Sequence, residues 1–464
     1  MMSVGLRALA AWAVLVLALG CASEGERTMA EKIDAASTNG TAAAVTASAI
    51  QSFEGSWEGN MSYLGQKIAV KLRLLQDGSG WYGRMDIPPQ NAFNLPLEAI
   101  RAEGGTLQAT LPGAVPLVLE LKLAATVLSG KFTQGAAAGG FSATRSGSAE
   151  SLRAEVAAAA AAELAAVDPS IVPEAVEIAV PGGKLYGTLS RPADGAPDTA
   201  ILIIPGSGPT DRDGNSILLP GKNNSLLMLG NALVKSGNMV LRIDKRGVGK
   251  SVWPGLREED MTIDMMAEDA SAWLAYLRGR TGINRLAVIG HSEGALVALL
   301  AARTADPEAL VLLTPLSADF FDTIFKQLSG ASEEYLQRAR FIYEELRAGR
   351  YVAEVQEDQL NLFRPSVQPY LRSLIVHQPS ALLAAEDTSV LVVAGGRDLQ
   401  IELADAKALA AARPGVGFLL LEEMNHVLKS VGPDVAENQA SYINPGHPLA
   451  AGLVEGIAGF ISGN

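Results

Sequence analysis

A serine flanked by glycines is the first feature of this sequence that could do chemistry. The segment G-H-S-E-G, residues 290–294, follows an apolar run at 286–289 and precedes a run of good helix formers. A strand, a sharp turn and a helix form a nucleophile elbow, in which glycines two residues before and after the serine allow close backbone approach. Ser292 is therefore the predicted nucleophile, and the alternative is a tight turn with an incidental serine.

A serine nucleophile needs a base to take its proton and an acid to orient that base. The chain has only four histidines. His426 follows the last predicted strand, at the carboxyl end of the sheet where sites of open α/β folds lie, and it is the preferred base. His447, in a turn before the final helix, is its rival. We expect His291 to support the site from beside the nucleophile, and His377 to lie in a helical insertion.

The predicted acid is Asp398, which follows an apolar strand at 390–394 and two glycines. A carboxylate on this turn can reach the histidine, whereas its alternative role is to cap the helix expected from residue 401. Glu402 is the next candidate for the acid. The chain order Ser292, Asp398, His426 is the order found in α/β-hydrolases.

An oxyanion hole requires two backbone N–H groups that point to the site of developing negative charge. Glu293, directly after the nucleophile, is expected to supply one. Ser207, or otherwise Gly208, supplies the other from the turn after the strand at 199–204, while Pro209 has no N–H to donate. The Glu293 side chain either binds a substrate amine or a nearby base, or points to solvent at the helix N-terminus. No phosphate-binding loop motif follows this turn.

In the rest of the second half of the chain, predicted strands alternate with predicted helices. This alternation predicts a mostly parallel sheet with helices on both faces. The expected strands are 174–180, 184–191, 199–204, 239–243, 286–289, 309–313, 389–394 and 417–421. Helices are expected at 225–235, 263–277 and about 448–461. Residues 317–386 lack strands and are predicted to form a helical cap whose aromatic side chains line a pocket or pack against the sheet.

The first half differs in pattern. Short runs of alternating apolar and polar residues separated by glycine and proline predict a small antiparallel β domain at 53–146. An alanine-rich linker helix is expected at 147–170, so the α/β domain occupies 171–464. We find no catalytic constellation in the β domain and expect it to serve as a packing or spacing domain, with carbohydrate, lipid or partner binding as the alternative.

The N-terminus has the pattern of an exported protein. Residues 1–20 read as a signal peptide, and Ala18-Leu19-Gly20-Cys21 resembles the bacterial lipobox, in which the cysteine is lipidated. The alternative is an ordinary signal peptide cleaved nearby. Residues 21–52 are poor in large apolar side chains and are expected to form a flexible tether. We thus expect a membrane-anchored lipoprotein that faces the periplasm or the cell exterior.

The composition of the chain restricts the classes of partner that it can bind. The net charge of −13 provides no basic surface for phosphates, which argues against nucleic acid as a partner. Hydrophobic residues make up 48% of the chain, as in globular proteins. No pattern indicates an oligomeric state.

Five segments together resemble bacterial α/β-hydrolases of the esterase and serine-aminopeptidase-like group: I-I-P-G-S-G-P-T-D-R-D-G-N (203–215), L-R-I-D-K-R-G-V-G-K-S (241–251), G-H-S-E-G (290–294), G-G-R-D (395–398) and N-H (425–426). The resemblance covers the chain from about Glu174 onward and implies an α/β-hydrolase fold with a helical cap. It departs from the common pattern at Pro205-Gly206, where His-Gly is usual. The segment Asp244 to Ser251 is expected to shape the wall of the site.

The function expected from these residues is that of a serine carboxylesterase acting on short or medium acyl esters, with no cofactor and no metal. A peptidase and a thioesterase or acyltransferase are alternatives, since they use the same catalytic residues. A different class of alternative is an inactive hydrolase fold that serves as a scaffold or binding protein of the cell envelope.

Overall fold

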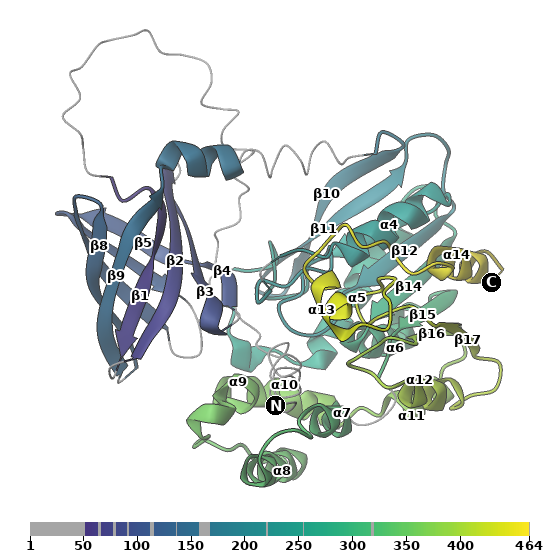
Figure 1. Ribbon diagram of the computed structural model, residues 1–464. Helices are drawn as coiled ribbons and strands as arrows, with labels where there is room; N and C mark the ends of the chain where they lie inside the picture. The colour runs from purple at the N-terminus through teal and green to yellow at the C-terminus, as the bar shows by residue number, and fades with distance from the viewer. Residues whose placement is uncertain are drawn as a thin grey trace. The chain divides into compact units, whose positions relative to one another are not determined.

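The computed structural model describes residues 52–63, 66–77, 80–90, 92–111, 116–135, 137–156, 168–219, 221–253, 255–316 and 320–463. The chain forms two compact units: the first contains Ala22–Asp168 together with the short segment Ile217–Pro220, and the second contains Pro169–Ser216 and Gly221–Asn464 (Figure 1). The predicted signal peptide, Cys21 and the tether up to residue 51 lie outside the described residues. Of the predicted linker helix, residues 149–156 are helical, whereas 157–167 lie outside.

Nine strands form one antiparallel sheet in the first unit, in the order β4-β3-β2-β1-β9-β8-β7-β6-β5. Alternate side chains face one buried core, as Leu72 and Leu74 on β2 and Leu119 and Leu121 on β7 do. This confirms the predicted antiparallel β domain. The strands are β1 (Gly55–Tyr63), β2 (Gln66–Asp77), β3 (Gly80–Ile87), β4 (Ala92–Pro96), β5 (Glu98–Glu103), β6 (Thr106–Leu111), β7 (Leu117–Ala124), β8 (Val127–Gln134) and β9 (Ala137–Gly147), with a 3-10 turn η3 (Pro88–Gln90) after β3.

The second unit is built on an eight-stranded sheet in the order β10-β11-β13-β12-β14-β15-β16-β17. The pairs β10–β11 and β11–β13 are antiparallel, and all the others are parallel. This is the sheet of an α/β-hydrolase, as predicted. Its strands are β10 (Ile171–Val180), β11 (Gly183–Pro192), β12 (Thr199–Ile204), β13 (Met239–Ile243), β14 (Arg285–His291), β15 (Ala309–Leu313), β16 (Ser389–Gly395) and β17 (Gly417–Leu421).

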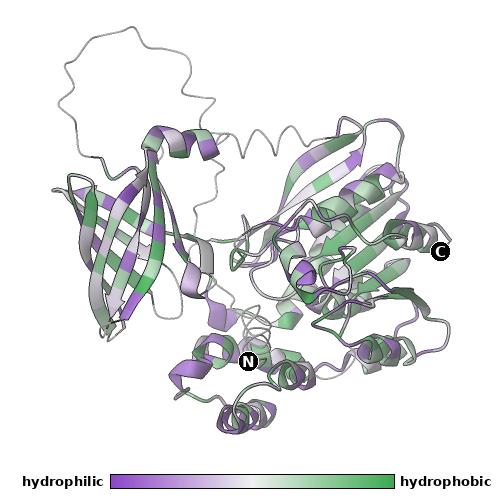
Figure 2. Ribbon diagram, viewed as in Figure 1, coloured by the Kyte–Doolittle hydropathy of each residue, from purple (hydrophilic) through white to green (hydrophobic). Residues whose placement is uncertain are grey.

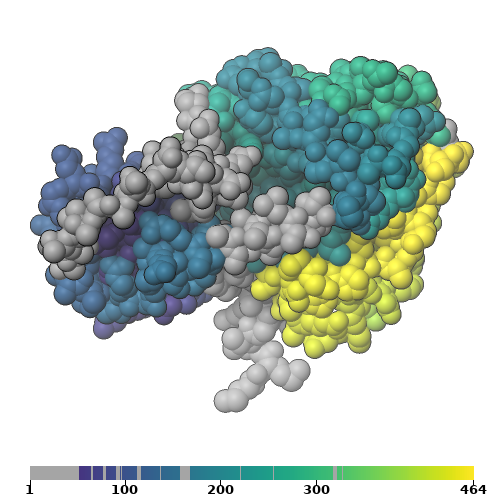
Figure 3. All heavy atoms as spheres, turned by 90° about the horizontal axis from the view of Figure 1, so that it is seen from above, coloured from purple at the N-terminus to yellow at the C-terminus, as the bar shows by residue number. Residues whose placement is uncertain are grey.

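Helices cover both faces of this sheet, which explains why its central strands are apolar without alternation. On β12, Leu202 and Ile204 pack on the side of α5 and α6. Ile201 and Ile203 pack on the opposite side, with α4 and α14. Figure 2 shows the central strands as hydrophobic, and in Figure 3 the C-terminal segment lies at the surface in yellow. The helices are α4 (Ser225–Lys235), η4 (Glu258–Asp260), α5 (Ile263–Arg278), α6 (Glu293–Ala305), α12 (Leu403–Ala410), α13 (Val435–Ser441) and α14 (Leu453–Gly463).

The insertion between β15 and β16 is helical over its described part, so it forms the predicted cap. Phe321, Phe363 and Tyr370 are buried in one cluster with residues of α5 and α6, so these aromatic side chains pack and do not line an open pocket. Phe321 lies 4.6 Å from Tyr343 between ring centroids. The cap helices are α7 (Phe320–Gln327), α8 (Glu333–Arg347), η5 (Glu357–Gln359), α9 (Leu360–Phe363), η6 (Pro365–Val367), α10 (Gln368–Ile375) and α11 (Pro379–Ala384).

The last helix begins at Leu453, later than the predicted start at about 448. The preceding residues bond to the loop after β17 instead: Ser430 N donates to the Pro448 carbonyl and Ala450 N donates to the Leu428 carbonyl. Gly452 then has φ +81°, which ends this extended segment. Within the described ranges, no helix combines the length and apolarity that a membrane span requires.

Candidate active site

The turn between β14 and α6 holds Ser292 in a strained conformation, with φ 54° and ψ −118°. A side chain at Gly290 would collide with the backbone of Gly294, and a Cβ at Gly294 would lie 2.5 Å from the Ile204 carbonyl oxygen. The glycines of the predicted motif are therefore required by close packing. Ser292 N donates to the Leu313 carbonyl at 2.8 Å, which fixes the turn against the next strand. A strained residue at this edge of the sheet is the geometry expected of a nucleophile elbow.

Asp398 and His426, predicted as acid and base, lie together after β16 and β17. Asp398 Oδ2 is 2.9 Å from His426 Nδ1, and their side chains are 2% and 6% exposed. Asp398 Oδ1 accepts from the backbone N–H groups of Gln400 and Ile401 at 2.7 and 2.9 Å. The carboxylate is thus held by its own loop while it orients the imidazole. It does not cap α12, whose N-cap residue is Glu402.

The glycines before Asp398 permit a close approach of two loops. A side chain at Gly395 would collide with the Met424 carbonyl, and a Cβ at Gly396 would lie 2.5 Å from the Glu422 carbonyl oxygen. Arg397 N donates to the Met424 carbonyl at 2.9 Å. The glycines therefore allow the acid loop to lie against the base loop.

The base loop is braced by amide side chains that the sequence did not identify as functional. Asn425 is fully buried and donates to Asn438 Oδ1 at 3.0 Å and to Ser441 Oγ at 2.7 Å. Asn438 in turn donates to the Arg397 carbonyl at 2.7 Å. Helix α13 thereby connects the loops of base and acid. The N-H pair at 425–426 was the only sequence signal for this arrangement, since α13 itself was not predicted.

His291 connects the elbow to the base. Its Nε2 lies 2.8 Å from the His426 carbonyl oxygen, and the two ring centroids are 5.0 Å apart. Because a carbonyl only accepts, Nε2 carries the proton and donates. Burial and the neighbouring His426 lower the pKa of His291 to about 3, so its ring is neutral. His291 supports the position of His426, which is the role expected from the sequence.

The remaining histidines lie elsewhere. His447, the rival base, offers its carbonyl to Lys429 Nζ at 2.8 Å. His377 Nε2 lies 2.7 Å from Asp264 Oδ1 and connects the cap to α5. The acid carboxylate therefore orients His426 and neither of these two.

The turn after β12, predicted to supply an oxyanion donor, lies against the nucleophile. A Cβ at Gly206 would be 3.1 Å from His291 Nδ1 and 3.3 Å from Ser292 Cβ, so only glycine fits without displacement. Ser207 follows directly, and Gly208 has φ +68°. The Ser207 carbonyl accepts from Thr210 Oγ1 at 2.8 Å, which closes the turn.

Glu293 is 2% exposed at its side chain, so the solvent-directed alternative is wrong. Its Oε1 lies 3.8 Å from Nζ of Lys245, a residue that is also buried and that donates to the Gly206 carbonyl. Burial lowers the pKa of Lys245, and Glu293 opposes that shift. In the cap, burial and the charge of Glu293 raise the pKa of Tyr370. Lys245 was not predicted; it lies in the D-K-R-G segment expected only to form a wall.

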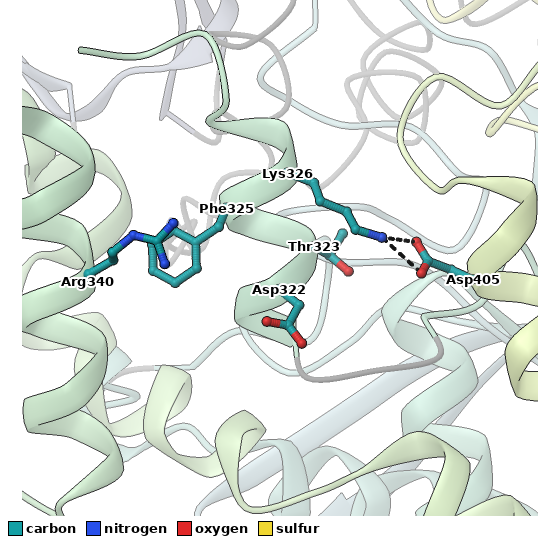
Figure 4. Close-up of a pocket in the computed structure, with 6 residues that line it drawn as sticks. All are labelled: Asp322, Thr323, Phe325, Lys326, Arg340 and Asp405. Carbon is teal, nitrogen blue, oxygen red and sulfur yellow. Dashed lines mark hydrogen bonds and ion pairs between the residues drawn. The ribbon is translucent and has the colours of Figure 1, made fainter. Parts of the chain in front are cut away.

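The cap is fastened to the body by ion pairs. Arg364 Nε donates to Glu258 Oε2 at 2.8 Å, with side chains 6% and 11% exposed. A separate open hollow of about 410 Å³ lies between α7, α8 and α12 (Figure 4). Its cations already have partners, because Lys326 binds Asp405 at 3.0 Å and Arg340 lies over the Phe325 ring. These contacts link α7 of the cap to α8 and to α12.

Among the described residues, no group of three or more His, Cys, Asp or Glu side chains could hold a metal ion. The candidate reactive groups of the site are the Ser292 hydroxyl, the His426 imidazole and the Asp398 carboxylate. Such groups support acyl transfer through a serine nucleophile.

The sheet order, the elbow and the cap define the second unit as an α/β-hydrolase. More particularly, it is similar to the group of esterases and serine-aminopeptidase-like hydrolases, because residues 222–428 match the family model described as serine aminopeptidase, S33. Esterase EstD of Thermotoga maritima is 25% identical over 289 residues, which cover 61% of this chain and 66% of EstD, just under two thirds of that relative.

Solved structures of similar fold include esterases. Est1E from Butyrivibrio proteoclasticus, solved with ferulic acid bound, is 18% identical over 62% of this chain and 96% of its own, with a TM-score of 0.41. The esterase Pf2001 of Pyrococcus furiosus is 17% identical over 63% of this chain and 93% of its own, with a TM-score of 0.38.

Proposed function

We propose that the protein is a serine carboxylesterase that hydrolyses short or medium acyl esters. The observation that carries the proposal is the buried hydrogen bond between Asp398 and His426, with His426 joined through His291 to the elbow of Ser292. The family match and the similarity to EstD also support it.

In the proposed mechanism, His426 Nε2 takes the proton of Ser292 as its Oγ attacks the ester carbonyl. Asp398 keeps the proton of the imidazole on Nδ1 and stabilises the imidazolium that forms. Backbone N–H groups of Glu293 and Ser207 stabilise the negative oxygen. His426 then protonates the leaving alcohol, and a water activated by the same histidine hydrolyses the acyl-enzyme to the free acid and Ser292.

Glu293 bears on the peptidase alternative. An aminopeptidase would need a carboxylate to hold the N-terminal amine of its substrate, and Glu293 was the candidate beside the nucleophile. This carboxylate is buried and lies next to the ammonium of Lys245. The ester substrate is therefore the better supported proposal.

The test begins with a fluorophosphonate probe on wild type and Ser292→Ala. We expect labelling that disappears in the variant. Hydrolysis of p-nitrophenyl esters of increasing chain length, compared with amino-acid p-nitroanilides, then separates esterase from peptidase. Faster cleavage of the anilides would favour the peptidase, and a folded wild type that neither labels nor hydrolyses would favour the inactive scaffold.

We also propose that the mature chain is anchored to a membrane by a lipid on Cys21, on the periplasmic or outer side. The lipobox-like sequence before this cysteine supports the proposal. Fractionation of cells expressing Cys21→Ala tests it: the variant should appear in the soluble fraction, and unchanged membrane retention would remove the anchor from Cys21.

A further inference from the structure

Lys245 is a buried cation that touches the oxyanion turn. It lies two residues beyond β13, Gly206 lies two residues beyond β12, and Ser292 follows β14. The strands are parallel neighbours in the order β13-β12-β14, with Ile203 opposite Arg242 and Ile204 opposite Gly290. The three segments therefore meet at one edge of the sheet, where Lys245 Nζ donates to the Gly206 carbonyl.

The bond to this particular carbonyl matters because of peptide geometry. The Gly206 carbonyl and the Ser207 N–H belong to one planar trans peptide, in which they point in opposite directions. A donor that holds the carbonyl from one side thus sets the direction of the N–H on the other. The peptide lies against the nucleophile, since a Cβ at Gly206 would be 3.3 Å from Ser292 Cβ.

The same ammonium also faces the residue that supplies the second oxyanion donor. Lys245 Nζ is 3.8 Å from Glu293 Oε1, and both side chains are at most 3% exposed. The Glu293 carboxylate offsets the cost of burying the ammonium, whose other acceptor among the described residues is the neutral Gly206 carbonyl. Lys245 is therefore connected to both segments that carry oxyanion donors.

We propose that Lys245 is a positioning residue that, together with Glu293, fixes the Gly206–Ser207 peptide in the orientation that makes the Ser207 N–H an oxyanion donor. This inference rests on the proposed esterase function. Lys245 itself does not touch the substrate; it acts through the turn.

The test uses the full chain with Lys245→Met and with the double variant Lys245→Met/Glu293→Gln. Methionine keeps the length of the side chain without its donor, and the double variant leaves no unpaired buried charge to unfold the protein. As a matched control, Arg246→Met/Asp269→Asn removes another buried ion pair, whose side chains are 7% and 9% exposed. Thermal melting confirms that each variant is folded.

The readout is hydrolysis of a p-nitrophenyl ester compared with the matching thiono ester, in which sulfur replaces the carbonyl oxygen. Sulfur accepts hydrogen bonds weakly and gains little from an oxyanion hole. Since loss of one oxyanion donor costs about 10²–10³ in kcat, we expect both Lys245 variants to lose roughly 10- to 100-fold in kcat on the oxygen ester, with KM changed less than about threefold. The loss on the thiono ester should be much smaller, and the control should keep the wild-type ratio of the two rates.

Equal losses on both esters, or wild-type activity in the folded double variant, would overturn the proposal. A crystal structure of the double variant tests the role of Lys245 independently of activity. The Gly206–Ser207 peptide should have a different orientation from that in wild type, and an unchanged orientation contradicts the proposed role. Should wild type hydrolyse neither ester, the esterase proposal fails and this crystal structure alone decides the role of Lys245.

Discussion

The two carboxylate oxygens of Asp398 have different partners, and this difference predicts the result of a conservative substitution. In Asp398→Asn, the amide oxygen should remain at the Oδ1 position, where the backbone N–H groups of Gln400 and Ile401 require an acceptor. The amide NH2 then faces His426 Nδ1 and forces the imidazole into the tautomer protonated on Nε2, which cannot take the serine proton. We expect normal folding and a fall in kcat of about 10³- to 10⁴-fold in ester hydrolysis.

Glu402→Gln is the matched control for this substitution. Glu402 was the next candidate for the acid, but its side chain is 65% exposed and pairs with Lys326. The esterase activity of the Glu402→Gln variant should equal that of wild type. Loss of activity in Glu402→Gln with retention in Asp398→Asn would exchange the roles of the two residues.

Because the pKa of His291 is lowered in the folded protein, we expect the free energy of unfolding to depend on pH. Its pKa is about 3 in the folded protein against 6.5 for the free side chain, so the unfolded chain binds the extra proton below pH 6.5. The stabilisation by neutral His291 is complete above pH 6.5 and is lost as the pH falls toward 3, by roughly 1.4 kcal/mol per pH unit.

The measurement compares urea unfolding of wild type and His291→Gln between pH 8 and 4. Glutamine keeps a donor for the His426 carbonyl but does not titrate. The advantage of wild type should shrink steadily below pH 6.5, and a difference that stays constant with pH would show that His291 is not buried as a neutral ring.

At the scale of elements, the short helix η4 takes part in two ion pairs, one buried between the cap and the body and one exposed. In η4, Glu258 binds Arg364 of the cap, whereas Asp260 binds the exposed Arg257. Removing one partner of a buried ion pair leaves an uncompensated charge, so we expect Glu258→Gln to lower the free energy of unfolding by about 3 kcal/mol. Asp260→Asn, measured in the same urea titration, should leave the unfolding midpoint unchanged; equal effects of both variants would mean that the cap is not anchored through Arg364.

The elements that sequence predicted well are those with strong local signals. The strands of the second unit are apolar runs between turns, and α4 and α5 were predicted within one residue of their bounds. The start of α14 was missed because residues 448–450 bond to a loop about twenty residues earlier, a contact that no local propensity expresses. Lys245 was missed for the same reason: its bond to Gly206 joins positions 39 residues apart on different loops. Ser292, Asp398 and His426 could be named as candidates from the sequence because each lies in a segment of characteristic composition that follows a strand.

At the scale of the whole molecule, the hydrophobic cores divide between the two units. One core is made of residues between Phe53 and Ala143, and the two cores on either side of the eight-stranded sheet lie between Ile171 and Ile461. All candidate catalytic residues belong to the second unit. Because a unit with its own core can fold alone, a chain that begins at Asp168 should fold without the β unit.

We expect this shortened chain to hydrolyse p-nitrophenyl esters with a kcat within about twofold of the full protein, since residues 292, 398 and 426 and their described supports are all retained. Residues 52–156 expressed alone should give the circular dichroism of a β protein and no hydrolysis. A shortened chain that keeps its cooperative unfolding but loses activity would mean that the β unit takes part in the site. In that case the spacing role expected of the β domain would be wrong, and substrate recognition would be its function.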